Sequence, residues 1–264
     1  MRHRRLIAWI LVGAAAMITA VRIGTMIAGA SEPGSTVASV HVGLWESLLV
    51  VLQIVSCAFV LWIYSNRKPI PSSPIAGQLA NPPIINFLFG DKDSAPLWAV
   101  VRFYVGFAWL SAGYGKIRDQ AWMISGTALK QFWMMTTAPS PPESPPQRTY
   151  DWYHAFLTFM LHNDWFTWLA KVIAVGEVVV GVFLLCGAFV GIVSLFGAVL
   201  NFNYALAGSA GANTVLLIMG SLLVTAWMVS GYIGLDRYLL PRLGTPWHRV
   251  RHGRHRGSQS RPVT

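Results

Sequence analysis

The chain has 264 residues, of which 54% are hydrophobic and only 11% are charged. A soluble domain carries about 25% charged residues, so this composition indicates a membrane protein and leaves no room for a sizeable soluble domain. The net charge of +10 gathers beside apolar segments, as it does in the cytoplasmic flanks of membrane spans. That placement argues against nucleic acid as a partner.

The first two predicted spans form an N-terminal module, residues 1–64. Residues 6–29 follow the basic start MRHRR, and residues 43–64 precede the basic stop SNRK. The first segment also has the features of a cleavable signal peptide. We favour a retained span, because apolar residues continue past Arg22, which can snorkel to the interface. In either case residues 30–42 would lie outside the cell.

A Pro- and Ser-rich connector, residues 65–95, separates this module from a predicted membrane domain at 96–239. Its proline density excludes a continuous helix, and the apolar piece IINFLFG within it is too short to cross a membrane. After the membrane domain, residues 240–264 form a basic tail that we expect to be disordered. The membrane domain itself contains four predicted spans, at 96–117, 165–186, 188–207 and 212–234.

A long exterior segment, residues 118–164, joins the first two spans of this domain. It contains the extended tract PSPPESPP between two aromatic stretches, which are typical of interfacial helices because Trp and Tyr prefer the headgroup level. Tight turns join the remaining spans. Six spans place both termini in the cytoplasm, and every short loop agrees with the positive-inside rule. The predicted location is the cell membrane, with the lipid bilayer as the first partner.

Residues from about 96 to 239 resemble the DoxX family, particularly its DoxD-like branch. The resemblance is carried by four pieces in order: RFYVGFAWLSAGYGKIRDQAW, VIAVGEVVVGVFLLCG, NFNYALAGSAGAN and YIGLDRY. It implies an all-α integral membrane protein with a four-helix transmembrane bundle, here preceded by two additional transmembrane helices. It also implies the membrane subunit of a thiosulfate:quinone oxidoreductase, with a small sulfur anion as substrate, a membrane quinone as electron acceptor and a second oxidoreductase subunit as a candidate partner.

Two ionisable residues, Arg102 and Glu177, lie inside predicted spans. An uncompensated charge there costs about 2.5–3.5 kcal/mol on insertion scales, so such residues are expected to face the bundle interior and to pair. A rise of ~1.5 Å per residue places Arg102 roughly 9 Å from the inner end of its span, and Glu177 roughly 18 Å from the outer end of the next. We therefore predict an Arg102–Glu177 ion pair. It would act either in catalysis, with Glu177 as a proton acceptor in quinone chemistry, or only in fixing the helix register.

A second group of polar residues is expected near the outer ends of the core helices. A lysine with amide side chains offers a small oxyanion a cation and directed N–H donors, and amides also suit a quinone carbonyl. The alternative is that the lysine snorkels and the asparagines cap helix ends. The candidate substrate- or quinone-binding residues are Lys116, Trp122, Asn201, Asn203, Tyr204 and Asn213.

Small residues are expected where helices approach closely. Gly106 and Gly113 in the first core span, and Gly176 and Gly181 in the second, present small faces of the kind that pack in membranes. At the inner end of the last span, the neighbouring residues 236 and 237, an aspartate and an arginine, are expected to form a local pair.

The sequence contains no motif for haem, an iron–sulfur cluster, flavin or a metal ion. Its two cysteines stand far apart in apolar segments, and none of its seven histidines falls within a span. Electrons would therefore pass directly from a bound sulfur species to quinone, or through a partner. The alternative to an enzyme is a non-enzymatic membrane scaffold for a redox complex. A solute permease ranks last, because no inverted repeat or broken helix pair is present.

Overall fold

The computed structural model of the chain describes residues 2–29, 51–52, 54–66, 81–138, 149–209 and 211–244. This part of the chain is built from helices and contains no strand, in agreement with the predicted all-α class. Some features predicted from the sequence lie outside the described residues: the exterior residues 30–42, the start of the second span at 43–50, connector residues 67–80, the PSPPESPP tract and the tail from residue 245.

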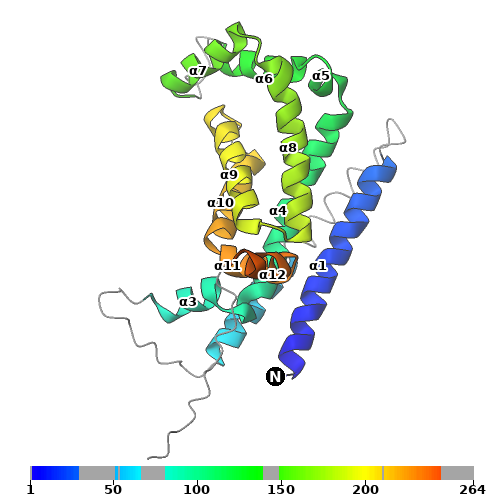
Figure 1. The fold of residues 1–264 in the computed structure, drawn as a ribbon, viewed down its shortest axis with the longest axis vertical. Helices are drawn as coiled ribbons and strands as arrows, with labels where there is room; N and C mark the ends of the chain where they lie inside the picture. Colours follow the sequence, from blue (N-terminus) through cyan, green and yellow to red (C-terminus); the bar gives the residue numbers. More distant parts are fainter. Residues whose placement is uncertain are drawn as a thin grey trace, which may run out of the picture.

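Four helices stand side by side in a bundle (Figure 1): α4 (Ala95–Arg118), α8 (Phe166–Cys186), α9 (Val190–Leu206) and α10 (Gly211–Thr225). The closest pairings are α4 with α8 and α9 with α10. Two helical stretches, Lys92–Arg118 and Phe166–Cys186, are long and apolar enough to cross a membrane, whereas α9 and α10 are shorter apolar helices. The bundle interior is lined by apolar side chains such as Trp98, Trp109 and Leu184.

The last predicted span, 212–234, is not one continuous helix. The helix stops at Thr225, and after Ala226 only a short helix, α11 (Trp227–Ser230), continues. The chain then turns beneath the bundle and leads into α12 (Asp236–Leu239) and a 3₁₀ turn, Leu240–Leu243. The turn follows from close packing, since Gly234 lies directly against Gly187 of the α8–α9 turn.

The N-terminal segments are helical, as predicted. The long helix α1 (Arg2–Gly29) lies along α4 in Figure 1, and the Arg22 guanidinium sits 3.9 Å from the centre of the Phe107 ring. A second helix, Ile54–Ser65, packs near the short helix α3 (Pro83–Gly90), and the tilted rings of Tyr64 and Phe87 lie 5.3 Å apart between centroids. A 3₁₀ turn, Lys92–Ser94, then leads into α4. Within the described residues, the apolar stretches of these two helices run over Leu6–Arg22 and Ile54–Ser65.

Three helices lie across one end of the bundle (Figure 1): α5 (Gln120–Met123), α6 (Thr127–Thr137) and α7 (Asp151–His162). They form the two aromatic stretches that the sequence predicts to be helical. A separate apolar core joins them to the bundle, with buried residues Leu129, Trp133, Tyr153, Leu157 and Phe166 among its members. This layer covers the bundle end at which α4 finishes and α8 begins.

At the opposite end, Arg102 holds the C-terminal end of α8. Its guanidinium donates hydrogen bonds to the carbonyl oxygens of Leu184 (2.6 Å), Leu185 (3.1 Å) and Ile233 (2.6 Å). The last carbonyls of a helix have no partner within the helix, and a cation is favoured beside them. Arg102 is only 1% exposed, so this contact lies inside the fold.

Asp236 binds free backbone N–H groups at the start of α9. Its carboxylate accepts hydrogen bonds from the backbone N–H groups of Phe189 (2.5 Å) and Val190 (2.9 Å). Burial raises the pKa of the Asp236 carboxyl, and these two bonds together with the Arg102 charge counteract part of that rise. The expected local pair with the next residue is wrong: Arg237 lies over a tyrosine ring, because the free N–H groups of α9 take the carboxylate instead.

Glycines allow α4 and α8 to approach until their backbones nearly touch. A Cβ added to Gly113 would lie 2.7 Å from the backbone nitrogen of Val178, and one added to Gly181 would lie 2.5 Å from that of Leu110. By contrast, Gly176 on the same helix has open space around it. The predicted small face therefore holds for Gly181 and Gly113 but not for Gly176.

This difference gives a matched pair of substitutions. Gly181→Ala should lower the free energy of unfolding by about 1–3 kcal/mol, because the added methyl group meets the backbone of α4. Gly176→Ala should leave stability unchanged or raise it by up to about 1 kcal/mol through helix propensity. Unfolding of the purified protein in detergent micelles measures both. Equal effects of the two substitutions would contradict the close approach.

Candidate functional site

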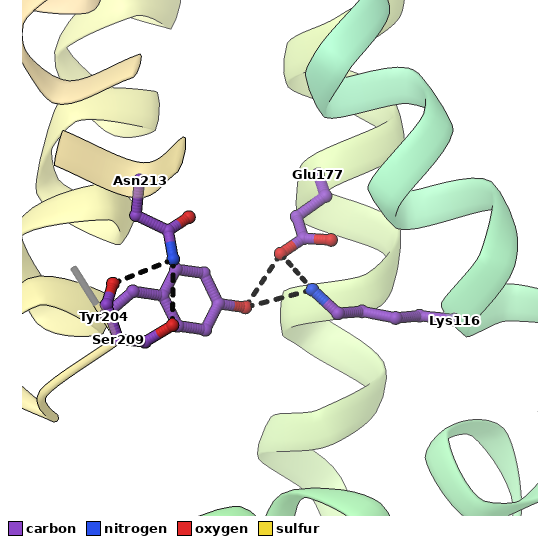
Figure 2. Close-up of polar contacts among 5 residues, drawn as sticks. All are labelled: Lys116, Glu177, Tyr204, Ser209 and Asn213. Carbon is purple, nitrogen blue, oxygen red and sulfur yellow. Dashed lines mark hydrogen bonds and ion pairs between the residues drawn. The ribbon is translucent and has the colours of Figure 1, made fainter. Parts of the chain in front are cut away.

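The polar side chains of Lys116, Glu177 and Tyr204 meet in the bundle interior, one from each of α4, α8 and α9. The Lys116 ammonium lies 2.5 Å from Glu177 Oε1, and the Tyr204 hydroxyl donates to the same oxygen at 2.7 Å. Lys116 also donates to the Tyr204 hydroxyl oxygen at 3.0 Å. Figure 2 shows this closed triangle, which we call the Lys116 cluster.

The side chains of the cluster differ in their exposure to solvent. The Glu177 side chain is 1% exposed, whereas the Lys116 side chain is 19% exposed. The second carboxylate oxygen of Glu177, Oε2, is buried and has no hydrogen-bond partner. A buried carboxylate needs a charge partner and hydrogen bonds to remain ionised, and here one oxygen receives both while the other keeps its accepting capacity. The cluster as a whole is electrically neutral.

Aromatic rings surround the Lys116 ammonium. Its nitrogen lies 4.9 Å from the centre of the Trp122 ring and 5.1 Å from that of Tyr204, both within cation–π range. The Phe132 ring packs edge-on against Tyr204, with 6.1 Å between centroids. The predicted candidates Lys116, Trp122 and Tyr204 therefore come together around Glu177.

The three asparagines take separate positions. Asn203 donates to the carbonyl oxygen of Val199 on its own helix (2.8 Å), and Tyr153 of α7 donates to the Asn203 carbonyl oxygen (3.2 Å). Burial raises the pKa of Tyr153 to about 12, so this hydroxyl stays protonated at neutral pH. Asn213 donates to the backbone and hydroxyl oxygens of Ser209, which ties the turn between α9 and α10 (Figure 2). These two amides thus bond locally, to oxygen atoms four residues before them in the chain.

Asn201 differs from the other two. It is 1% exposed, and neither its amide nitrogen nor its amide oxygen has a hydrogen-bond partner. It lies three residues before Tyr204 on α9, so the two side chains point to the same side of the helix. Ser194, seven residues earlier, also has a buried hydroxyl without a partner. A line of buried polar atoms therefore runs along α9 from the Lys116 cluster.

The predicted Arg102–Glu177 ion pair is wrong. The 14 residues between Arg102 and Lys116 correspond to about 21 Å along α4, and it is Lys116 that meets Glu177. Counting depth from the predicted ends of the spans is valid only if the two helices begin and end at the same levels. Instead Gly106 packs against Leu184, so the first turns of α4 extend past the end of α8 and carry Arg102 there.

Sequence reasoning identified all three members of the cluster but paired them incorrectly. The sequence predicts Lys116 near the outer end of its helix, but three residues before it Gly113 packs against the backbone beside Glu177. The spacing of Gly113 and Lys116, about one helical turn, is the signal that would have shown this. No sequence pattern indicates that Asp236 binds the start of α9, because its partners are backbone N–H groups 46 and 47 residues away.

No family model, no curated protein and no solved structure matches this chain. The resemblance to the DoxX family therefore stays a prediction from the sequence. Among the described residues, no three His, Cys, Asp or Glu side chains gather closely enough to hold a metal ion. The site must accordingly be argued from the chemistry of the Lys116 cluster.

Breaking the ion pair from one side should be costly. Lys116→Met leaves a buried carboxylate without its cation, which should lower the free energy of unfolding by about 3–5 kcal/mol. Adding Glu177→Gln to that variant should cost less than Glu177→Gln costs in the wild-type protein, because the unpaired charge is removed. A double-mutant cycle of unfolding free energies measures the coupling. Strictly additive effects would show that the pair contributes no coupling energy.

Proposed function

We propose that this chain is a six-span membrane protein of the DoxX type, and that it forms the membrane subunit of a quinone-linked oxidoreductase acting on a small sulfur anion such as thiosulfate. The sequence resemblance supplies the reaction class. The buried Lys116 cluster, with its unused Glu177 oxygen, is the observation that carries the proposal. Both termini would lie in the cytoplasm, and α5, α6 and α7 would cover the outer end of the bundle.

The outward faces of the bundle support a membrane setting. Large apolar side chains are exposed along α8 and α9, and a water-soluble monomer rarely presents such a surface without a partner. A bilayer would cover these faces and leave the polar cluster inside. The exposed apolar residues are Val172, Val175, Val179, Val182, Ile192, Leu195, Phe196, Val199 and Phe202.

The residues present fit a quinone. The ammonium of Lys116 can donate to a carbonyl oxygen, and the rings of Trp122 and Phe132 offer flat apolar surface beside it. A quinone, when bound, accepts two electrons and two protons. Glu177 and the Tyr204 hydroxyl share one hydrogen bond and form a short path along which a proton can pass to or from the Lys116 side.

The sulfur half of the reaction can supply the electrons for the quinone but not the protons. Joining two thiosulfate ions through a new S–S bond releases two electrons and no protons, so the protons for quinol formation must come from elsewhere. The Lys116 cluster holds both groups needed on this chain, a cation for the sulfur anion and a carboxylate for proton exchange. The electron route from anion to quinone is direct in this scheme, or it passes through a partner subunit.

One alternative has an observation in its favour. Because Lys116, Tyr204 and Glu177 satisfy one another, the cluster also suits a purely structural role that holds α4, α8 and α9 together. In that case the chain would be a non-enzymatic membrane scaffold for a redox complex. The two proposals differ in whether substitution of Lys116 removes activity from a fully assembled protein.

The test follows thiosulfate-dependent reduction of a soluble quinone analogue by membranes containing the protein. Lys116→Met should reduce the rate by about 100-fold or more, the usual effect of removing a charged donor from an anion site. Lys171→Met is the control, because Lys171 is an exposed lysine on α8. Full activity of Lys116→Met at equal protein level would exclude this site. Absence of activity in all samples, with a copurifying redox partner, would favour the scaffold.

A further inference from the structure

We infer that the Lys116 cluster binds a small anion only together with a proton: the anion takes the place of Glu177 beside Lys116, and Glu177 takes up one proton. This inference rests on the anion site of the proposed function and adds the linkage to protons. The ligand class is a small oxyanion of sulfur, for which thiosulfate and sulfate serve as probes.

The geometry of Lys116 is the first step. An ammonium has three N–H donors, and the contacts with Glu177 Oε1 and the Tyr204 hydroxyl use two of them. The Lys116 side chain is 19% exposed whereas that of Glu177 is 1% exposed. An anion that approaches the cluster therefore meets the ammonium first and is separated from the carboxylate by it.

The charge of the site is the second step. Lys116 and Glu177 together are neutral, so an added anion would leave the cluster with a net negative charge in an apolar interior. The neighbouring cations have other contacts: Arg118 donates to the Tyr114 hydroxyl, and Lys130 lies over the Phe166 ring. Asp119 accepts a hydrogen bond from the N–H of Ala121 at the start of α5.

The third step is the fate of the carboxylate. Once an anion occupies Lys116, Glu177 would remain buried and charged without a cation, which is the costliest arrangement for such a group. Taking up one proton removes that charge. For a dianion such as thiosulfate or sulfate, one dianion and one proton enter, the lysine keeps its charge and the glutamate becomes neutral. The site then carries one net negative charge instead of two. The Tyr204 hydroxyl can donate to the carboxylate or accept from the protonated acid, so its contact survives both states.

A definite pH dependence follows. In the pH range where Glu177 is ionised in the free protein and protonated in the anion-bound protein, each unit of rising pH should weaken the apparent affinity about tenfold. Above and below that range the slope should vanish. Simple screening of a surface lysine would instead give affinity that depends on salt and not on pH in this way.

The experiment is titration calorimetry on the purified full-length chain in detergent micelles at constant ionic strength. Sodium thiosulfate and sodium sulfate are titrated in two buffers that differ in ionisation enthalpy, which reports the number of protons exchanged. We expect uptake of about one proton per bound anion in the wild-type protein. Because this measurement needs no variant, it does not depend on whether a substituted protein folds.

Three variants sharpen the result. Glu177→Gln should still bind the anion, with no proton uptake and no pH slope, since its side chain is already neutral. Lys116→Met should lose binding, and Lys171→Met should match the wild-type protein. Circular dichroism and thermal unfolding confirm that each variant is folded before it is compared.

Anion binding without proton uptake, an unchanged pH slope in Glu177→Gln, or no binding of either anion by the wild-type protein would each overturn the inference. The results that would overturn the proposed function are different from those that would overturn the proton linkage. Proton-linked binding without thiosulfate-dependent quinone reduction would overturn the oxidoreductase and leave the site. Quinone reduction without proton-linked binding would overturn only the linkage.

Discussion

The alignment of α4 against α8 is the constraint on which the rest of the structure depends. Gly113 and Gly181 let the two helices touch at the backbone, so neither helix can slide without creating a clash. In this one register Lys116 comes to lie beside Glu177, and the first turns of α4 extend past the end of α8 to bring Arg102 to its carbonyls. The Lys116 cluster, and the binding of Arg102 to the end of α8, are thus two consequences of the same contact.

The bundle stabilises the buried charges of Arg102 and Glu177 in different ways. The difference distinguishes a structural contact from one that can take part in chemistry. Arg102 is held by carbonyl oxygens at a helix end, with Asp236 close by on the next helix start, and these groups cannot leave without opening the α8–α9 turn. Glu177 is held by two side chains, Lys116 and Tyr204, which can change partners while the backbone stays in place. Exchange of protons or anions is therefore expected at Glu177 and not at Arg102.

The helical class, the core helices up to Thr225 and the interfacial aromatic helices could all be predicted, because apolar length and composition determine them locally. The members of the site were also predictable, since polar residues in apolar segments are few. Their pairing was not, because depth counted from predicted span ends cannot reveal an offset between helices. The offset depends on which glycines face a neighbour, and Gly176 and Gly181 look alike in the sequence. The end of α10 was missed for a similar reason: the chain turns where distant glycines meet.

A neutral cluster inside an apolar bundle restricts the chemistry that it can perform. Adding or removing a single charge there is costly. An electron that enters together with a proton leaves the net charge unchanged, and an anion that enters together with a proton adds one charge fewer than the anion alone. Reduction of a quinone consists of such paired events, whereas oxidation of thiosulfate releases electrons alone, so the protons must come from another group. Lys116 can hold the negative partner and Glu177 the proton, and the Tyr204 hydroxyl, bonded to both, keeps them in contact as the charges change. The burial of the cluster is therefore the physical reason to expect that anion binding and proton transfer are inseparable in this protein.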